Sequence, residues 1–331
     1  MAGTVILSVI IKALNEEKNI RRTIESVLQA TNGIETEIIV ADSKSSDRTV
    51  EIAREYPIRV VQLFDESQRS CGAAAQLGYQ YSTGEYIYLL DGDMEVVPGF
   101  IQAALAALGE NEQLAGVGGL MEEVSTGIEF RGRQQRMLAR ADRQPGIVDR
   151  LNGGGVYRRK ALEDVDYLAD INLHSYEELE LAMRLRVRGW QMARISMIAM
   201  RHYGHTVEPW RLIWARWATG YAKGSGEFMR SALDRPYLAE VIKELRIYLL
   251  MLGVWLVTLF LVAMAFWNLL FGVLAAGVWV AIFVAMFVKK RSLKGALYFM
   301  TSLQVFSFGL LVGFVKPRQD ALKLMKSCEI K

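Results

Sequence analysis

Two carboxylates that flank a glycine offer the clearest chemistry in this sequence. Asp91, Gly92 and Asp93 follow the apolar run 86–90, which lies between two glycines and indicates a buried strand. The strand therefore presents both carboxylates at its carboxyl end, where open α/β sheets bind ligands. A hard divalent cation takes one or two such carboxylates and completes its shell with phosphate oxygens. The pattern predicts a metal–diphosphate site, whereas an Asp-Gly turn in isolation is commonly only a turn.

The composition leaves room for a globular domain and a membrane part. The chain has 331 residues, 52% of them hydrophobic, and a net charge of only +3, so nothing global favours nucleic acid as a partner. Its two cysteines, Cys71 and Cys328, provide neither a disulfide framework nor a zinc spacing, which favours a reducing, cytoplasmic location. The apolar run 5–11 lacks a basic front and a cleavage site, so we expect a strand there and no secretory signal.

Strands and helices alternate along the first half of the chain. Apolar runs predict strands at 5–11, 37–41, 58–63 and 86–90, and helical periodicity predicts helices at 19–30, 49–56 and 72–81. This order predicts an α/β fold with a doubly wound, mostly parallel sheet. A dinucleotide-binding domain is excluded, because the turn after the first strand contains no glycine to admit a pyrophosphate.

Three segments together resemble family 2 glycosyltransferases of the GT-A fold. They are residues 7–17 with Asn15, Glu16 and Glu17, the turn 40–49 with Asp42 and Asp47, and the motif at 91–93. The resemblance implies that Ala13, Asn15, Glu17 and Asp42 embrace the nucleotide base and ribose of a nucleotide-sugar. It also implies that Asp91 contacts the ribose and that Asp91 and Asp93 hold a divalent metal, Mg or Mn. Lys44 stands where the family often has glycine, and we expect it to be solvated.

A glycine run and a glutamate pair come after the motif at 91–93, in the same order as in family 2 glycosyltransferases. Gly153, Gly154 and Gly155 permit close approach of the backbone to a ligand, and the resemblance implies that they lie beside the donor sugar. Residues 176–190 have the pattern of an amphipathic helix whose acids lead and bases trail, which suits the helix dipole. The resemblance implies that Glu178 is the general base and that Glu177 lies beside it, although the family usually has Asp. A single carboxylate base with direct displacement inverts the anomeric centre.

Two features of the middle region have alternative interpretations. His202 and His205 follow a strand-like stretch, and the resemblance implies that one of them contacts the metal; the alternative is two ordinary surface histidines. The basic segment 127–150 is either a solvated helix face or a surface that meets anionic lipid headgroups or a lipid-linked phosphate.

The last third of the chain predicts a membrane part. Trp210, Trp214 and Trp217, interspersed with basic residues, are typical of an interfacial helix. Residues 247–288 contain no charged side chain, which is enough for two transmembrane helices that turn near Asn268. The basic residues at 289–294 indicate the cytoplasmic side, and two crossings return the chain to that side. Residues 296–315 either span the membrane or form a re-entrant or interfacial helix.

These observations divide the chain into a catalytic GT-A domain (1–206), interfacial helices (207–245), a transmembrane region (246–315) and a basic tail (316–331). We expect an inverting, metal-dependent glycosyltransferase in the cell membrane, which moves a sugar from a UDP- or GDP-sugar to a polyprenyl-linked acceptor at the cytoplasmic face. The alternatives are a polyprenyl-monophosphate glycosyltransferase and a non-catalytic scaffold that binds a sugar nucleotide. A processive synthase is disfavoured, because Ile213 stands where its Gln-x-x-Arg-Trp motif needs glutamine.

Overall fold

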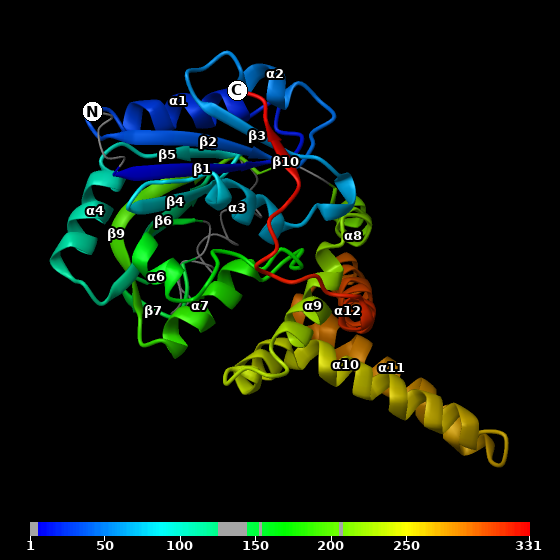
Figure 1. The fold of residues 1–331 in the computed structure, drawn as a ribbon. Coiled ribbons are helices and arrows are strands. Elements are labelled where there is room, and N and C mark those ends of the chain that lie inside the picture. The colour runs from blue at the N-terminus through cyan, green and yellow to red at the C-terminus, as the bar shows by residue number, and fades with distance from the viewer. Residues whose placement is uncertain (1–5, 125–143, 152–153, 205–207) are drawn as a thin grey trace. The chain divides into compact units, whose positions relative to one another are not determined.

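The computed structural model describes residues 6–124, 144–151, 154–204 and 208–331. It divides into two compact units (Figure 1). The first unit comprises residues 1–206 together with 318–331, and the second unit comprises residues 207–317.

The first unit begins with four parallel strands in the order β3-β2-β1-β4. In register, Ala13 lies opposite Asp42 and Lys12 lies opposite Asp91, so three strands end together at one edge of the sheet. The strands are β1 (Leu7–Ala13), β2 (Thr36–Asp42), β3 (Arg59–Leu63) and β4 (Tyr86–Asp91), and the intervening helices are α1 (Ile20–Ala30), α2 (Thr49–Ala53), η1 (Glu66–Gln68) and α3 (Cys71–Gln80).

Both faces of these strands are buried, which explains their nearly continuous apolar sequences. Side chains of a strand alternate between its faces. Val9 therefore packs in one core with Ile24 of α1, and Ile10 packs in the opposite core with Leu77 of α3. Helix α2 is shorter than the predicted 49–56, and its N-cap position is Arg48. The Asp47 carboxylate accepts a hydrogen bond from the Thr49 amide at 3.0 Å.

The second half of the first unit is a mixed sheet, which corrects the expectation of a mostly parallel one. Strand β8 runs antiparallel to both β4 and β6, while β9 runs parallel to β6. An antiparallel neighbour needs no helical crossover, so alternating strands and helices do not predict it. The elements are β5 (Met94–Val96), α4 (Phe100–Glu110), β6 (Leu114–Glu123), β7 (Gly146–Val148), β8 (Gly155–Arg158), α6 (Arg159–Glu163), α7 (Glu177–Val187) and β9 (Gln191–His202).

Helix α7, for which the sequence predicts an amphipathic helix, is buried over most of its length. Glu180 and Arg184 are 1% and 6% exposed and form an ion pair of 2.8 Å. Arg184 also donates to the backbone carbonyls of Val165 and Tyr167, which satisfies its guanidinium inside the protein. Glu180, one of the three leading glutamates, therefore has a structural role.

The segment after residue 317 belongs to the first unit and is not a separate basic tail. Strand β10 (Ser327–Glu329) pairs antiparallel with β3 and closes that edge of the sheet, as the red chain beside β3 in Figure 1 shows. Arg318 forms an ion pair of 2.6 Å with Asp170, whose side chain is fully buried. In the described residues the strands form one ten-stranded sheet.

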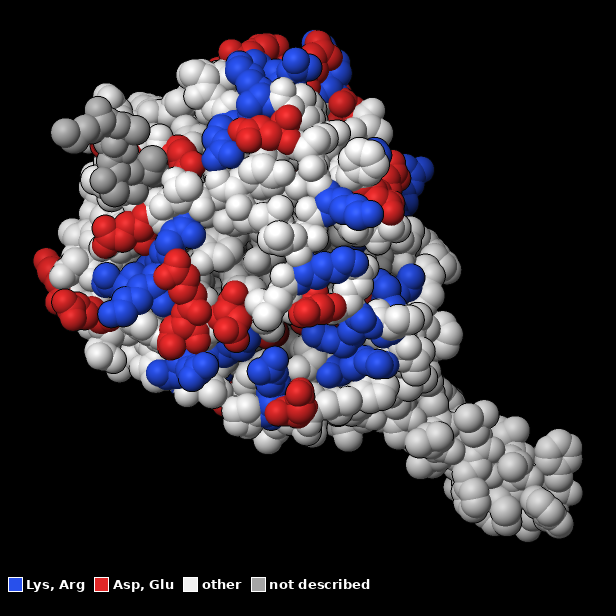
Figure 2. Space-filling view, in the orientation of Figure 1, with Lys and Arg blue, Asp and Glu red and all other residues white. Residues whose placement is uncertain are grey.

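The second unit consists of helices. Three of them are long and apolar enough to cross a membrane, by length and composition: α10, α11 and α12. Asn268 accepts a hydrogen bond from the Leu270 amide and caps α11, so the predicted turn near this residue is confirmed. Residues 247–288, which form most of the α10–α11 hairpin, contain no charged side chain, whereas blue and red side chains are plentiful over the first unit in Figure 2. The elements are α8 (Pro209–Ala218), η3 (Tyr221–Lys223), α9 (Gly224–Ser231), α10 (Leu238–Met264), α11 (Leu269–Lys290) and α12 (Leu293–Val315).

Candidate active site

A lysine at the end of the first strand connects two of the predicted site residues. The Lys12 ammonium lies 2.8 Å from Asp91 Oδ1 and 3.5 Å from Glu177 Oε1, and its side chain is 12% exposed. Burial by itself lowers the pKa of Lys12, but Asp91, Glu177 and Glu178 together outweigh it and raise the pKa well above its ordinary value. Lys12 is therefore a permanent cation between the sheet edge and the start of α7.

Lys12 is not among the site residues that the sequence predicts. A signal was present, because Lys12 is the one charged residue of strand β1, whose other residues except Ser8 are apolar. A cation that ends a buried strand needs a carboxylate partner. The neighbouring strand β4 supplies this partner in register, since Lys12 lies opposite Asp91.

The predicted base is held by the glycine run. The Gly154 amide donates a hydrogen bond of 3.1 Å to Glu178 Oε1. Gly154 has a φ of +94°, and a Cβ atom there would lie 2.3 Å from the Leu89 carbonyl oxygen, so no other residue fits this position. Gly155 begins β8 and pairs with Leu89 of β4. The backbone thus brings Glu178 to the strand that ends in Asp91, while Gly153 lies outside the described residues.

Asp93 lies next to one of the two candidate histidines. Strand β5 pairs with the end of β9 and brings His202 Nε2 to 3.1 Å from Asp93 Oδ2, while Nδ1 lies 2.7 Å from Glu123 Oε2. Hydrogen bonds to Asp93 and Glu123 outweigh the opposite effect of burial and raise the pKa of His202 to about 10. His205, the other candidate, lies outside the described residues, as does the arginine-rich part of the basic segment at 125–143.

The residues around Asp93 fit a metal that a ligand helps to bind. Within the described ranges, no group of three or more His, Cys, Asp and Glu side chains has an arrangement that could hold a metal alone. Asp93 and His202 Nε2 offer two ligands, and a cation such as Mg²⁺ or Mn²⁺ commonly takes its other ligands from substrate phosphates and water. Glu123 on Nδ1 would orient the imidazole, as carboxylates do for metal-bound histidines.

The loop after β1 and the turn after β2 form one connected rim. The Asn15 amide donates to Ser45 Oγ at 2.8 Å, and Asn15 Oδ1 accepts from the Ser46 amide at 2.8 Å. The Glu17 amide donates to Asp47 Oδ2 at 3.1 Å. Asn15 has a left-handed φ of 57°, a conformation that asparagine tolerates well. The loop with Ala13, Asn15 and Glu17 is thereby held beside the turn that contains Asp42.

Asp42 and Lys44, in the turn after β2, both make hydrogen bonds that hold this turn in place. Asp42 is fully buried and accepts hydrogen bonds from the Ser45 amide at 2.9 Å and from Gln62 Nε2 at 2.8 Å. The buried Asp42 carboxylate therefore stabilises the turn through its hydrogen bond with the Ser45 amide. Lys44 has a φ of 62°, which explains why glycine suits this position, and it donates to the Phe64 carbonyl at 2.7 Å instead of being merely solvated.

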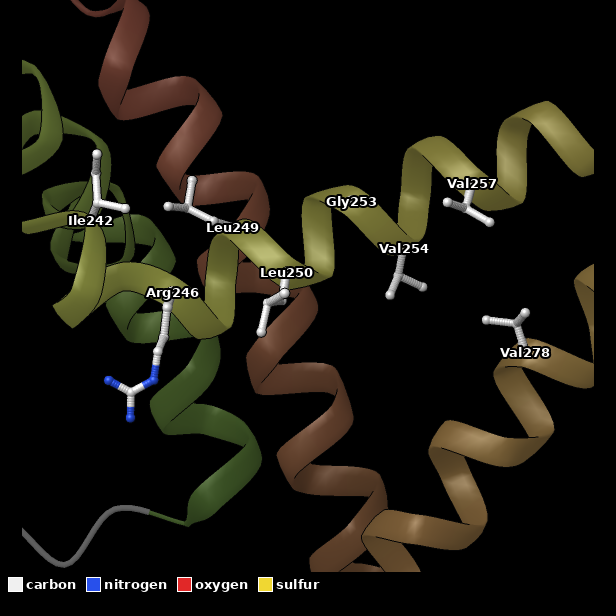
Figure 3. A pocket seen from close by; sticks show the side chains of 8 residues that line it. All are labelled: Ile242, Arg246, Leu249, Leu250, Gly253, Val254, Val257 and Val278. Carbon is white, nitrogen blue, oxygen red and sulfur yellow. The ribbon is translucent and has the colours of Figure 1, made fainter. Parts of the chain in front are cut away.

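The second unit contains an apolar groove with one cation. Its volume is about 550 Å³, and it lies between α10 and α11 (Figure 3). Arg246 is the one charged lining residue; the others are Ile242, Leu249, Leu250, Gly253, Val254, Val257 and Val278. Such a groove suits a hydrocarbon chain with an anionic end.

Comparisons with known proteins identify a family for the first part of the chain. The model of glycosyl transferase family 2 matches residues 8–166. A dolichol-phosphate mannosyltransferase from Pyrococcus furiosus is 32% identical over 105 residues, which are 29% of this chain and 29% of the relative. A 4,4'-diaponeurosporenoate glycosyltransferase from Staphylococcus haemolyticus is 35% identical over 94 residues, which are 27% of this chain and 24% of the relative. The chain thus spans less than a third of the length of these two relatives.

A solved structure shares the fold over most of the chain. Mannosyltransferase PcManGT from Pyrobaculum calidifontis, in complex with GDP-Man and Mn²⁺, has a TM-score of 0.63. The match covers 93% of this chain and 86% of that protein at 16% sequence identity, so it shows the fold alone. Residues 8–166, just under half of the chain, therefore match glycosyl transferase family 2, and the chain has the GT-A fold.

Proposed function

We propose that this protein is an inverting glycosyltransferase that moves a sugar from a UDP- or GDP-sugar to a polyprenyl-linked acceptor at the cytoplasmic membrane face. One observation supports this proposal most strongly. Lys12 joins Asp91, at the end of β4, to Glu177, at the start of α7, so the donor-side carboxylates and the glutamate pair share one site. That is the arrangement a direct displacement between a bound donor and an incoming acceptor requires.

In the proposed reaction, Glu178 removes the proton from the acceptor hydroxyl as its oxygen attacks the anomeric carbon. The bond from that carbon to the diphosphate breaks, and the nucleoside diphosphate leaves with the electron pair. Glu177 lies beside the base and is held by Lys12. The hydrogen bond from the Gly154 amide to Oε1 helps to orient the Glu178 carboxylate.

The remaining site residues would bind the donor. Ala13, Asn15 and Glu17 surround the base and ribose, with Asp42 supporting this rim through Ser45. Asp91 contacts the ribose and the metal, and the glycines at 153–155 lie along the donor sugar. Asp93 would hold Mg²⁺ or Mn²⁺ together with His202, or with His205 in its place. When bound, the metal neutralises the departing diphosphate as a Lewis acid.

The groove on α10 and α11 favours a lipid-linked acceptor. A polyprenyl chain would lie along its apolar walls, and Arg246 would meet the first phosphate of the lipid. The positive charge of Arg246 also supports a second candidate function, that of a polyprenyl-monophosphate glycosyltransferase. In such an enzyme the phosphate itself attacks the donor sugar. The match to a dolichol-phosphate mannosyltransferase supports that alternative. A non-catalytic scaffold that binds a sugar nucleotide would lack transfer with every acceptor.

The reaction is tested with purified protein, a panel of UDP- and GDP-sugars, Mn²⁺ and short polyprenyl acceptors that carry either a phosphate or a glycan diphosphate. We expect transfer with one donor. Glu178→Gln should lower kcat by about a hundredfold or more and leave donor binding unchanged. Asp93→Asn should abolish metal-dependent donor binding. Glu112→Gln, at an exposed loop position outside the site, is the control. Normal turnover by the Glu178 variant would rule out the proposed base, and no transfer in the whole panel would favour the scaffold.

The lipid groove is tested separately with two glycines. A Cβ atom at Gly253 meets no other atom within 4 Å, so Gly253→Leu places a side chain in the groove from an open position. Gly277, on α11 and outside the groove lining, is equally open, so Gly277→Leu is the matched control. We expect only the Gly253 variant to raise the KM for a long polyprenyl acceptor, with donor hydrolysis unchanged. Equal effects of the two variants would remove the groove from the proposal.

A further inference from the structure

Three helices of the second unit qualify as membrane spans, yet the chain after them returns to the first unit. Residues 1–206 and 318–331 form one compact unit, and β10 is a strand of its sheet. Arg59 binds Glu329 at 2.7 Å, and the Val60 amide donates to the Lys331 carbonyl at 2.7 Å. A strand cannot join a sheet from the opposite side of a bilayer. The polypeptide between these parts therefore crosses the membrane an even number of times, and three full spans are excluded.

The contacts of α12 show which helix does not cross. Along its length α12 packs on the short helices at the start of the second unit. Tyr298 contacts Trp210 with ring centroids 5.8 Å apart, and Phe308 stacks on Trp217 at 5.6 Å. Near its end, a Cβ atom at Gly313 would lie 2.0 Å from the Lys223 carbonyl oxygen, so helix and backbone are in direct contact there.

These partner helices are too charged to enter the hydrocarbon core. The α8–α9 region carries Arg211, Arg216, Lys223, Glu227 and Arg230. A charged side chain at the centre of a bilayer is costly and is therefore rare there. Glu227 is buried against α12's end, where it forms an ion pair of 3.1 Å with Lys316. Because α12 packs along α8, η3 and α9 from its first turns to its last, it lies at the same depth in the membrane as they do.

The contacts between α12 and α10 also indicate that α12 does not cross the membrane. α12 meets α10 through Tyr248 stacked on Phe306 and through a hydrogen bond of 2.6 Å from Trp255 to Gln304. These α10 residues follow directly on its charged first turns, which end at Arg246. Farther out, α10 pairs with α11, where Trp279 donates to Thr258 at 3.1 Å. The best span window of α12 is 28% buried, compared with 6% for α10 and for α11.

We propose that only α10 and α11 cross the bilayer, and that α12 lies with α8, η3 and α9 in the headgroup region of the leaflet on the side of the first unit. Exposed Trp210 and Trp214 are residues that favour this region. The hairpin tip, where Phe266 and Trp267 are 90% and 78% exposed, reaches the opposite face. This inference concerns only the placement in the membrane and does not depend on the reaction.

The test uses single cysteines in the full-length protein and a membrane-impermeant maleimide, applied to sealed vesicles of both orientations. Cys328 on β10 is exposed and serves as the native reporter in a Cys71→Ser background. Three further reporters in a Cys71→Ser, Cys328→Ser background are Glu112→Cys in the first unit, Phe266→Cys at the tip and Lys289→Cys at the end of α11. All four positions are exposed.

We expect labelling at 112, 289 and 328 in one vesicle orientation and labelling at 266 in the other. Labelling of 328 from the side opposite to 112 would mean three crossings and would overturn the proposal. Labelling of 289 together with 266 would mean that α11 does not cross and would also overturn it. The same holds for labelling of all four positions from one side, which would mean that the hairpin does not cross.

Discussion

At the scale of single residues, two cations organise the carboxylates of the candidate site. Lys12 lies between Asp91 and Glu177, and His202 lies between Asp93 and Glu123. Carboxylates this close would repel one another without a cation among them. The free site is thus held in place by protein cations on two sides, before any metal or donor enters.

Lys12→Met tests the first of these cations. Methionine keeps most of the side-chain volume but removes the charge, so Asp91 and Glu177 lose their shared partner. We expect kcat/KM for sugar transfer to fall by about tenfold to a hundredfold, which corresponds to about 1.4–2.8 kcal/mol of lost stabilisation. Steady-state kinetics measure this. Lys160→Met, at an exposed position on α6, should change nothing. Equal kinetics of the two variants would show that Lys12 is dispensable.

His202 predicts a pH dependence of stability for the metal-free protein. Its pKa is about 10 in the folded state and about 6.5 in an unfolded chain. A raised folded pKa stabilises the protein fully below pH 6.5, and this contribution is lost as the pH rises to about 10. We expect the melting temperature in EDTA to fall between pH 7 and pH 10. The fall should be smaller for His202→Gln, and an identical pH profile of the variant would contradict the assignment.

At the scale of elements, the site depends on how β8 and α7 meet the end of β4. Gly154 joins them, because its backbone lies against the Leu89 carbonyl and its amide holds Glu178. Gly154 is therefore a packing requirement, and the position of the proposed base, Glu178, follows from it. The helix dipole alone would not place Glu178 beside a particular strand.

Gly154→Ala should disrupt this junction. Gly154 and Gly189 both have a positive φ, of +94° and +87°, but only Gly154 would bring a Cβ atom against backbone. Both alanine variants carry the conformational penalty of about 1–2 kcal/mol for a left-handed residue. We expect only Gly154→Ala to lose sugar transfer as well, measured at a temperature where both variants remain folded. Equal activities would show that the close approach at Leu89 does not position the base.

At the scale of the whole molecule, the helices of the second unit are inserted within the sequence of the first. The segment 318–331 completes the first unit through β10 and through the ion pair between Arg318 and Asp170. Both ends of the helical insertion are therefore fastened to the same folded body. This connectivity is what limits the number of membrane crossings.

Arg318→Met tests how strongly that closing segment is held. Asp170 is fully buried, and loss of its partner would leave an uncompensated charge at a cost of about 3–5 kcal/mol. We expect a clear fall in the melting temperature of the purified protein. Lys326→Met, at an exposed position of the same segment, should melt like the parent protein. An Arg318 variant as stable as the Lys326 variant would mean that β10 alone fastens the segment.

The sequence alone determines what depends on local pattern. Apolar runs and helical periodicity locate β1 to β4 and their helices, because strands and helices form from neighbouring residues. Carboxylates at strand ends predict the site at 91–93, since parallel strands present their carboxyl ends at one edge. The uncharged stretch 247–288 likewise predicts the hairpin and its turn near Asn268.

Only the tertiary structure decides which distant residues meet. Lys12 and Glu177 are 165 positions apart, and Arg59 and Glu329 are 270 positions apart, so no local pattern relates them. Four other features also depend on contacts between distant parts of the chain. They are the antiparallel pairing of β8, the burial of the ion pair of Glu180 with Arg184, the contact of His202 with Asp93, and the pairing of β10 with β3. Each depends on which surfaces the packed sheet leaves available, because a buried charge or a strand edge is satisfied by whatever group the fold brings to it.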